Sequence, residues 1–182
     1  MLIKKSQKER LVSGKSSRQK SRGFTLIEVI VVVAILGLAS LALYPLILNS
    51  LETRSLDSEA RKVLSTLERT KFRAVKTKLD HRLRFYQQQE QWYYQVEVEE
   101  SADNWQTVTG EVPQAIPIKF NVTINLPNQW IEFSPIGIVV NYDPQMNSIV
   151  LQSDRLQQAG QPDVRRIWVY QGGSIRYQKE ES

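Results

Sequence analysis

The sequence of 182 residues contains no cysteine and only one histidine, His81. Without cysteine, the chain can form neither a disulfide nor a thiolate metal site. One histidine gives little basis for an imidazole metal cluster or for a Ser-His or Cys-His nucleophile, and its place after a charged segment predicts a solvent-exposed side chain. No glycine-rich phosphate-binding loop is found in the sequence either. We therefore expect a protein without enzyme activity, cofactor or resident metal ion.

Acidic residues are scarce where the chain begins. Residues 1–23 carry eight Lys or Arg and a single acid, Glu9, which gives this segment a net charge of +7. Because the whole chain has a net charge of +5, residues 24–182 are left with −2. The basic character belongs to the N-terminal segment, which weakens the usual inference of nucleic-acid binding. The polar, serine-rich composition of residues 1–22 predicts a disordered cytoplasmic segment.

Charged residues almost disappear between Phe24 and Leu48, where Glu28 is the only one. As an α-helix, this run would span about 37 Å, enough to cross a bilayer. Basic residues before the run and none immediately after it predict a cytoplasmic N-terminus, with the rest of the chain outside. Gly37 and Pro45 lie inside the run and are the expected helix-kink positions, and Pro45 should kink the helix without ending it. Glu28 needs an explanation, because an acid at mid-bilayer costs about 2.5–3.5 kcal/mol.

Glycine and proline are absent from residues 46–109. Apolar residues in 51–79 recur at the spacing of a helix. The sequence therefore predicts one helix from about 24 to about 79, apolar all round in its first half and amphipathic in its second. The apolar face of the second half consists of Leu56, Ala60, Val63, Leu64, Leu67, Ala74 and Val75.

After Asp80 the periodicity changes to that of strands, and no further helix is expected. We expect strands at 82–87, 91–99, 105–109, 117–125, 130–134, 137–142 and 148–153, and a final hairpin of 165–171 and 174–178. Its two-residue turn would be Gly172-Gly173. The fold class is α+β, with a long N-terminal helix packed on an antiparallel β-sheet or sandwich. We divide the chain into a leader (1–23), an apolar helix half (24–48), an amphipathic half (49–80) and a β domain (81–182).

Four acids lie close together in the sequence after the second expected strand begins. A solvated strand edge, whose charges block aggregation, is the preferred interpretation over a cation site. The four acids are Glu97, Glu99, Glu100 and Asp103.

One interpretation of the N-terminus is an ordinary signal peptide or membrane anchor. Ser40-Leu41-Ala42 offers a small-residue cleavage site, and cleavage after Ala42 would start the mature chain at Leu43. The long basic segment and Glu28 argue against this interpretation. Cleavage after Ala42 would also divide a continuous helix.

The stretch RGFTLIEVIVVVAILGLASLALYP resembles the N-terminal segment of type IV pilins and type II secretion pseudopilins. The resemblance implies that a prepilin peptidase removes the leader after Gly23, and that the new N-terminal residue, Phe24, is N-methylated. It implies an assembly role for Glu28, the fifth mature residue, and a helix kink at Pro45. The implied partners are the inner membrane, the prepilin peptidase/methyltransferase and other pilin or pseudopilin subunits.

A physical account of Glu28 is consistent with this resemblance. Cleavage after Gly23 would place a charged amine on Phe24, about one helical turn from Glu28. In a bundle of helices, Glu28 of an incoming subunit can pair with the Phe24 amine of a neighbour, which neutralises two buried charges at once. The cost of the acid would then be relieved only by correct assembly.

The C-terminal half resembles GspH/FimT-type pseudopilins and minor pilins in the stretches IEFSPIGIVV, SIVLQSD and RRIWVYQGGSIRY. The absence of a C-terminal disulfide pair and of an obvious calcium loop favours a minor or accessory subunit over a major fibre subunit. Whether the machine is a type II secretion system, a type IV pilus or a competence system stays open. The residues that carry the resemblance are Phe133, Pro135, Gly137, Gly173, Ile175 and Arg176.

Capture of extracellular DNA is an alternative function, and a membrane-anchored β domain without a filament role is another. Two basic groups could hold phosphates, although a solvated helix face is the preferred interpretation of the first. The first group consists of Lys62, Arg69, Arg73 and Lys76, opposite the apolar stripe. The second consists of Arg165, Arg166, Arg176 and Lys179, near Trp168, Tyr170 and Tyr177, which could stack on bases.

Overall fold

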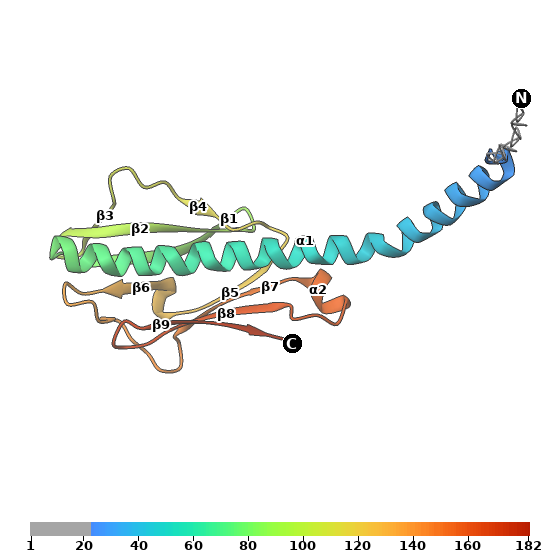
Figure 1. The fold of residues 1–182 in the computed structure, drawn as a ribbon. Coiled ribbons are helices and arrows are strands. Elements are labelled where there is room, and N and C mark those ends of the chain that lie inside the picture. Colours follow the sequence, from blue (N-terminus) through green and yellow to red (C-terminus); the bar gives the residue numbers. More distant parts are fainter. Residues whose placement is uncertain (1–22) are drawn as a thin grey trace, which may run out of the picture. The chain divides into compact units, whose positions relative to one another are not determined.

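A computed structural model describes residues 23–182, and Figure 1 shows the fold. Leu43–Ser182 forms one compact unit, and the preceding helical residues belong to another, so each is described by itself. The helix α1 runs over Leu26–Thr77, which confirms the predicted long helix to within two residues at each end. The predicted disorder of residues 1–22 lies outside the described residues.

The first sheet is antiparallel and has the strand order β3-β2-β1-β6, with β4 pairing with β2. Strands β1 and β2 form a hairpin in which Gln88 pairs with Gln91. Gln89 and Glu90 make the two-residue turn with φ angles of 49° and 64°, the left-handed conformation that a type I′ turn requires. The strands are β1 (His81–Gln88), β2 (Gln91–Ser101), β3 (Asn104–Thr107), β4 (Gln114–Ala115) and β6 (Trp130–Phe133).

The second sheet is also antiparallel and has the order β5-β7-β8-β9. A short helix, α2 (Asp154–Gln158), connects β7 to β8, so the expectation of no further helix was wrong. A 3-10 turn, η1 (Pro127–Gln129), precedes β6. The strands are β5 (Asn121–Asn125), β7 (Ser148–Gln152), β8 (Val164–Val169) and β9 (Ile175–Glu180).

The segment 137–142, expected as a strand, makes only an isolated bridge between Phe133 and Val139. The cause is a tight turn, because the N–H of Gly137 donates to the carbonyl oxygen of Ser134 at 2.8 Å. Gly137 has a φ of 82°, a left-handed conformation that interrupts an extended strand.

The core forms where the second half of α1 packs against the two sheets, which run alongside it in Figure 1. Thr70 lies on this face too, fully buried, and its hydroxyl donates to the carbonyl oxygen of Thr66 at 2.7 Å. Of the predicted apolar stripe, Leu64 is half-buried and Val75 is exposed. The residues that are fully buried as predicted are Leu56, Ala60, Val63, Leu67 and Ala74. These observations confirm the α+β fold class.

The turn between β8 and β9 is longer than predicted. The N–H of Tyr170 donates to the carbonyl oxygen of Ser174, and three residues, Gln171 to Gly173, complete the loop. Gly173 has a φ of 73°, and a Cβ there would lie 2.0 Å from the carbonyl oxygen of Gly137. This loop needs a glycine at 173 for its conformation and also for its close approach to the turn at Gly137.

Two polar residues expected on the surface are buried. His81 is 2% exposed, since it begins β1 and pairs with both Val98 and Phe133. Burial lowers the pKa of its imidazole below the ordinary value. Glu97 is 4% exposed, and its carboxylate accepts from Arg82 Nε at 2.6 Å. The expectation of a solvated site was therefore wrong for both residues.

Candidate processing and assembly site

The residues expected to form the cleavage site lie at the start of the described chain, just before α1. Gly23, Phe24 and Thr25 precede the helix, and Phe24 is 82% exposed. A Cβ at Gly23 would meet nothing within 4 Å. The Gly23–Phe24 bond is thus accessible in this conformation, and the fold itself does not require a glycine at position 23.

Thr25 and Glu28 cap the start of α1 reciprocally. The N–H of Glu28 donates to Thr25 Oγ1 at 3.2 Å, and the N–H of Thr25 donates to Glu28 Oε2 at 3.4 Å. This Thr-x-x-Glu arrangement is a capping box, which satisfies two of the free N–H groups of a helix terminus. The negative charge also interacts favourably with the positive end of the helix dipole. The sequence analysis missed this role, although the spacing of Thr25 and Glu28 would have revealed it.

The apolar half of α1 exposes its side chains on all sides. Leu26–Thr77 contains an 18-residue window with a mean hydropathy of 2.8, of which 0% is buried. By length and composition, this one helix of the described residues is able to cross a membrane. Within the run, the Ser40 hydroxyl donates to the carbonyl oxygen of Leu36 at 2.8 Å, so its polar group is satisfied inside the helix. Gly37 and Pro45 both lie within the continuous helix, and the kink at these two positions stays a prediction.

Three of the four residues of the first basic group are engaged in ion pairs, while Lys76 is exposed. Lys62 Nζ lies 2.6 Å from Glu59, and Arg69 and Arg73 lie 3.1 and 2.6 Å from the two carboxylate oxygens of Glu111. Glu111 belongs to the loop between β3 and β4, so these pairs fasten that loop to α1. Their positive charge is largely balanced within the protein, which makes the helix face a weaker phosphate site than predicted.

The second basic group is built around Asp57 of α1. Arg165 Nε donates to Asp57 Oδ1 at 2.5 Å, and Lys179 Nζ donates to Asp57 Oδ2 at 2.5 Å. The Tyr177 hydroxyl also donates to Asp57 Oδ1, at 3.1 Å. Burial raises the pKa of the Asp57 carboxyl, but the hydrogen bonds from Lys179 and Arg165 outweigh it and hold that pKa below the ordinary value. We call Asp57, Arg165, Tyr177 and Lys179 the Asp57 cluster.

Arg165 is 1% exposed, and its Nη1 donates to the carbonyl oxygens of Pro162 and Val164. In this conformation it is unavailable to a phosphate. Arg166 lies on the other face of β8 and pairs with Glu180 at 3.0 Å, while Arg176 is exposed over the Tyr170 ring at 5.9 Å. DNA capture by this group stays a prediction, and the internal pairing of Arg165, Arg166 and Lys179 counts against it.

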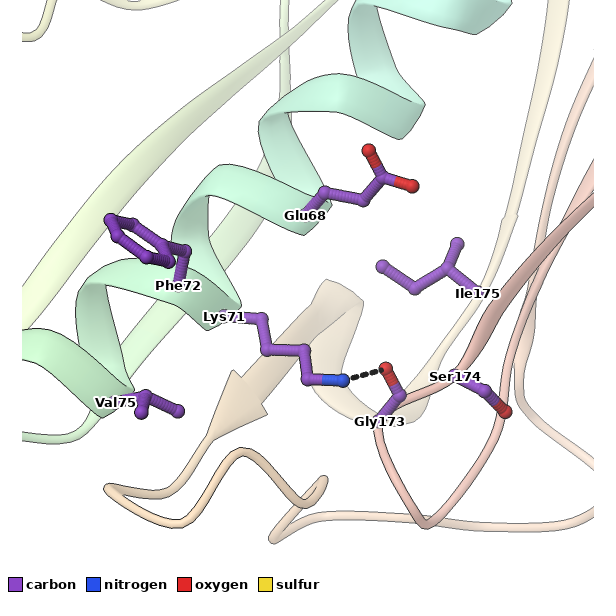
Figure 2. A pocket seen from close by; sticks show the side chains of 7 residues that line it. All are labelled: Glu68, Lys71, Phe72, Val75, Gly173, Ser174 and Ile175. Carbon is purple, nitrogen blue, oxygen red and sulfur yellow. Dashed lines mark hydrogen bonds between the residues drawn. The ribbon is translucent and has the colours of Figure 1, made fainter.

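A cavity of about 390 Å3 opens between the end of α1 and the β8–β9 turn, as Figure 2 shows. Lys71 Nζ crosses it and donates to the carbonyl oxygen of Gly173 at 2.8 Å. The ammonium therefore holds the turn against the helix. Its lining residues are Glu68, Lys71, Phe72, Val75, Gly173, Ser174 and Ile175.

A comparison with known families matches the N-terminal part of the chain. The prokaryotic N-terminal methylation motif matches residues 18–44, which include Gly23, Phe24, Glu28 and Gly37. No curated protein and no solved structure matches the chain. The match supports a type IV pilin-like subunit that is processed by prepilin peptidase and is structural rather than enzymatic. Together with the exposed apolar helix, it is consistent with a single-pass membrane anchor and assembly with other pilins.

Proposed function

We propose that this protein is a minor pilin-like subunit, a pseudopilin, that joins or primes a type IV pilus or a type II secretion pseudopilus. Prepilin peptidase cuts it between Gly23 and Phe24, and the new N-terminal Phe24 is methylated. The observation that carries this proposal is the match of the methylation motif to residues 18–44. These residues include the start of a helix whose first half is apolar and exposed and whose second half packs against the β domain.

The orientation follows from charge. Eight basic residues precede the apolar run and hold the N-terminus in the cytoplasm, so the β domain lies outside the inner membrane. Prepilin peptidase then acts on the cytoplasmic side, where the accessible Gly23–Phe24 bond is placed. After export of the domain, the apolar half of α1 is held in the membrane until it leaves for the filament.

Glu28 serves assembly through its charge. One of its carboxylate oxygens accepts from Thr25, at a long distance of 3.4 Å, so most of its hydrogen-bonding capacity remains for a partner. The amine of Phe24 in a neighbouring subunit is such a partner, because pairing relieves the cost of both charges in an apolar bundle. The capping box adds stability to the first turn of α1, from which Glu28 projects, and is separate from the charge pairing.

The assignment to the GspH/FimT type rests on the two turns that meet at the end of the domain. The resemblance named Gly137 and Gly173, and the structure brings these residues into contact across 36 positions of sequence. Both have positive φ angles, of 82° and 73°. The need for glycine in two turns that touch supports an architecture shared with GspH/FimT-type proteins for this half of the chain. It thereby supports a minor subunit.

Mass spectrometry of the protein recovered from cells that contain prepilin peptidase tests this function. The mature chain should begin at N-methyl-Phe24. Gly23→Leu should leave the precursor uncut, and Gly37→Leu is the matched control, since a Cβ at either glycine meets nothing within 4 Å. A mature chain that begins at Leu43 would instead assign the protein to the ordinary secretory class.

A further inference from the structure

The end of the globular unit at which α1 enters carries exposed basic and apolar side chains at the level where the apolar run stops. The run ends at Leu48, and the first polar residue, Asn49, is half-buried beside the β domain. Because Leu43–Leu48 belongs to the same compact unit as the strands, the structure gives the position of this boundary relative to them. Figure 1 shows α2 beside this part of α1.

Two hydrogen-bonded contacts bring basic residues of the β domain to this boundary. Arg155 Nε of α2 donates to Asn49 Oδ1 at 3.1 Å. Lys119 Nζ, in the loop before β5, donates to Glu52 Oε2 at 2.8 Å. Both basic residues therefore lie within about one helical turn of the last apolar residue of the run.

The height of these contacts matches the lipid headgroup layer. From Leu48 to Glu52, α1 rises about 6 Å. The headgroup region of a bilayer is about 5–7 Å thick on each side of the hydrocarbon core. When the apolar run lies in the membrane, Lys119 and Arg155 consequently lie at the depth of the phosphates.

The exposed side chains at this end fit an anionic lipid surface. Ile118, next to Lys119, is 69% exposed, and Tyr44 is 63% exposed within the apolar run. A tyrosine near the end of an apolar run is typical of a membrane interface, as is an apolar side chain flanked by basic ones. Lys119 has 46% of its side chain exposed, whereas the acid it pairs with, Glu52, has only 13% exposed. The Lys119 ammonium is therefore more accessible to solvent than the Glu52 carboxylate.

A groove lined by α1 residues alone lies at the same level along the helix. It has a volume of about 370 Å3, and its lining changes from apolar to basic in the direction that leads out of the membrane. Arg54 is exposed at the polar end, about 9 Å along the helix from Leu48. This order of side chains suits an acyl chain with its phosphate above it. The lining residues are Leu46, Ile47, Ser50, Leu51 and Arg54.

We propose that this end of the domain, which we call the lipid-facing edge (Arg54, Ile118, Lys119 and Arg155), rests on the bilayer and binds anionic phospholipid headgroups. The inference rests on the proposed function, because it requires the apolar half of α1 to lie in a membrane. The edge holds the domain against the membrane surface before the subunit is taken into a filament. Besides Glu52, exposed Asp154 adds a negative charge next to Arg155, and Asn121 Nδ2 donates to it at 2.6 Å.

A single-cysteine probe tests the contact directly, since the chain has no cysteine of its own. The full chain carrying Ile118→Cys is labelled with a fluorophore and placed in nanodiscs with phosphatidylglycerol or with phosphatidylcholine alone. Ile136→Cys is the matched control, because Ile136 is 76% exposed and its neighbour Gly137 lies against Lys71 and Val75, far along α1. We expect spin-labelled headgroups to quench the probe at 118 strongly in phosphatidylglycerol, weakly in phosphatidylcholine, and at 136 in neither.

Charge variants in the Ile118→Cys background measure the basic contribution. Arg155→Gln or Arg54→Gln should each lower the fraction in contact with phosphatidylglycerol about fivefold, from the known attraction of one basic residue to an anionic surface. Lys76→Gln, at the far end of α1, should leave it unchanged. Quenching at 118 no stronger than at 136 in phosphatidylglycerol would overturn the inference while the proposed function stood. Failure of the chain to enter nanodiscs at all would overturn both.

Discussion

The Asp57 cluster offers a quantitative test of the conclusion that Arg165 is structural. Asp57→Ala removes the carboxylate and leaves the guanidinium of Arg165, 1% exposed, with only two backbone carbonyl oxygens as acceptors. Breaking a buried ion pair from one side costs about 3–5 kcal/mol. Because 22% of the Asp57 side chain is exposed, we expect the lower end of this range, about 3 kcal/mol.

Removal of both charges should cost much less than removal of one. In Asp57→Ala/Arg165→Met no buried charge is left unpaired, and the thioether of methionine fills part of the vacated volume. The matched control is Glu180→Ala, which breaks the half-exposed pair with Arg166 and should cost at most about 1 kcal/mol. Urea unfolding of the full chain in detergent micelles, followed by tryptophan fluorescence, measures all three, since the four tryptophans all lie in Leu43–Ser182.

The pH dependence supplies a second measure of the same cluster. The folded pKa of Asp57 is below its unfolded value, so its contribution to the free energy of unfolding is complete above about pH 4 and is lost as the pH falls through the folded pKa. The difference between wild type and Asp57→Ala should therefore shrink in acid. The comparison must use this difference, because burial raises the pKa of Asp80 and of Glu132, which titrate with the opposite sign. In the urea experiment, an Asp57→Ala/Arg165→Met variant as unstable as Asp57→Ala would refute the conclusion that an unpaired Arg165 charge causes the loss of stability.

Three further predictions concern assembly, the turns and DNA. Glu28→Gln keeps an acceptor for the capping box, so it should be cleaved but should not co-purify with filaments. Thr25→Ala loses the cap but keeps the charge, so it should still co-purify with filaments. If both variants were lost from filaments to the same extent, charge pairing by Glu28 would be contradicted. Gly173→Ala should destabilise the unit by at least about 1–2 kcal/mol in urea unfolding, from the left-handed φ alone. Gly172→Ala, where a Cβ meets nothing within 4 Å, should stay within about 0.5 kcal/mol. Short duplex DNA titrated into the full chain should bind only at low salt, and binding at physiological salt that is lost in Arg166→Gln/Arg176→Gln/Lys179→Gln would restore the DNA-capture hypothesis.

Local pattern was sufficient to predict the long helix and most strands. The spacing of Leu56, Ala60, Val63 and Leu67 has the helical period, and all four residues are fully buried. Alternation along residues 82–87 likewise predicted β1, where Leu83 and Phe85 face the core. These signals depend only on residues close together in sequence, so a single chain displays them completely.

The errors arose where burial depends on distant partners. His81 is buried because β6, some 50 residues later, pairs with the start of β1. Arg165 was predicted as part of a possible phosphate site, but its acceptor, Asp57, lies 108 positions earlier in α1. Neither the charge nor the hydropathy of these residues predicts a contact with a partner so far away in the sequence.

Polar contacts between α1 and the β domain recur at intervals along the amphipathic half of the helix. Asn49 binds Arg155, Glu52 binds Lys119 and Ser153, and Asp57 binds Arg165, Tyr177 and Lys179. Farther on, Lys71 binds the carbonyl oxygen of Gly173. Apolar packing alone permits a helix to rotate or slide by small amounts, whereas hydrogen bonds of defined direction at four levels do not.

A fixed rotation of α1 has a consequence for a subunit that joins other helices. Residues 54, 58, 61 and 65 remain exposed on one side of the helix, because the buried apolar stripe lies on the opposite side and the polar contacts fix the rotation. The same face is therefore offered to a neighbour in every copy, before any neighbour arrives. Association then needs little further ordering of the helix, so little of the free energy of contact between subunits is offset by a loss of conformational entropy. For a proposed pilin-like subunit, these polar contacts of α1 thus contribute to specificity of assembly as well as to the stability of the domain.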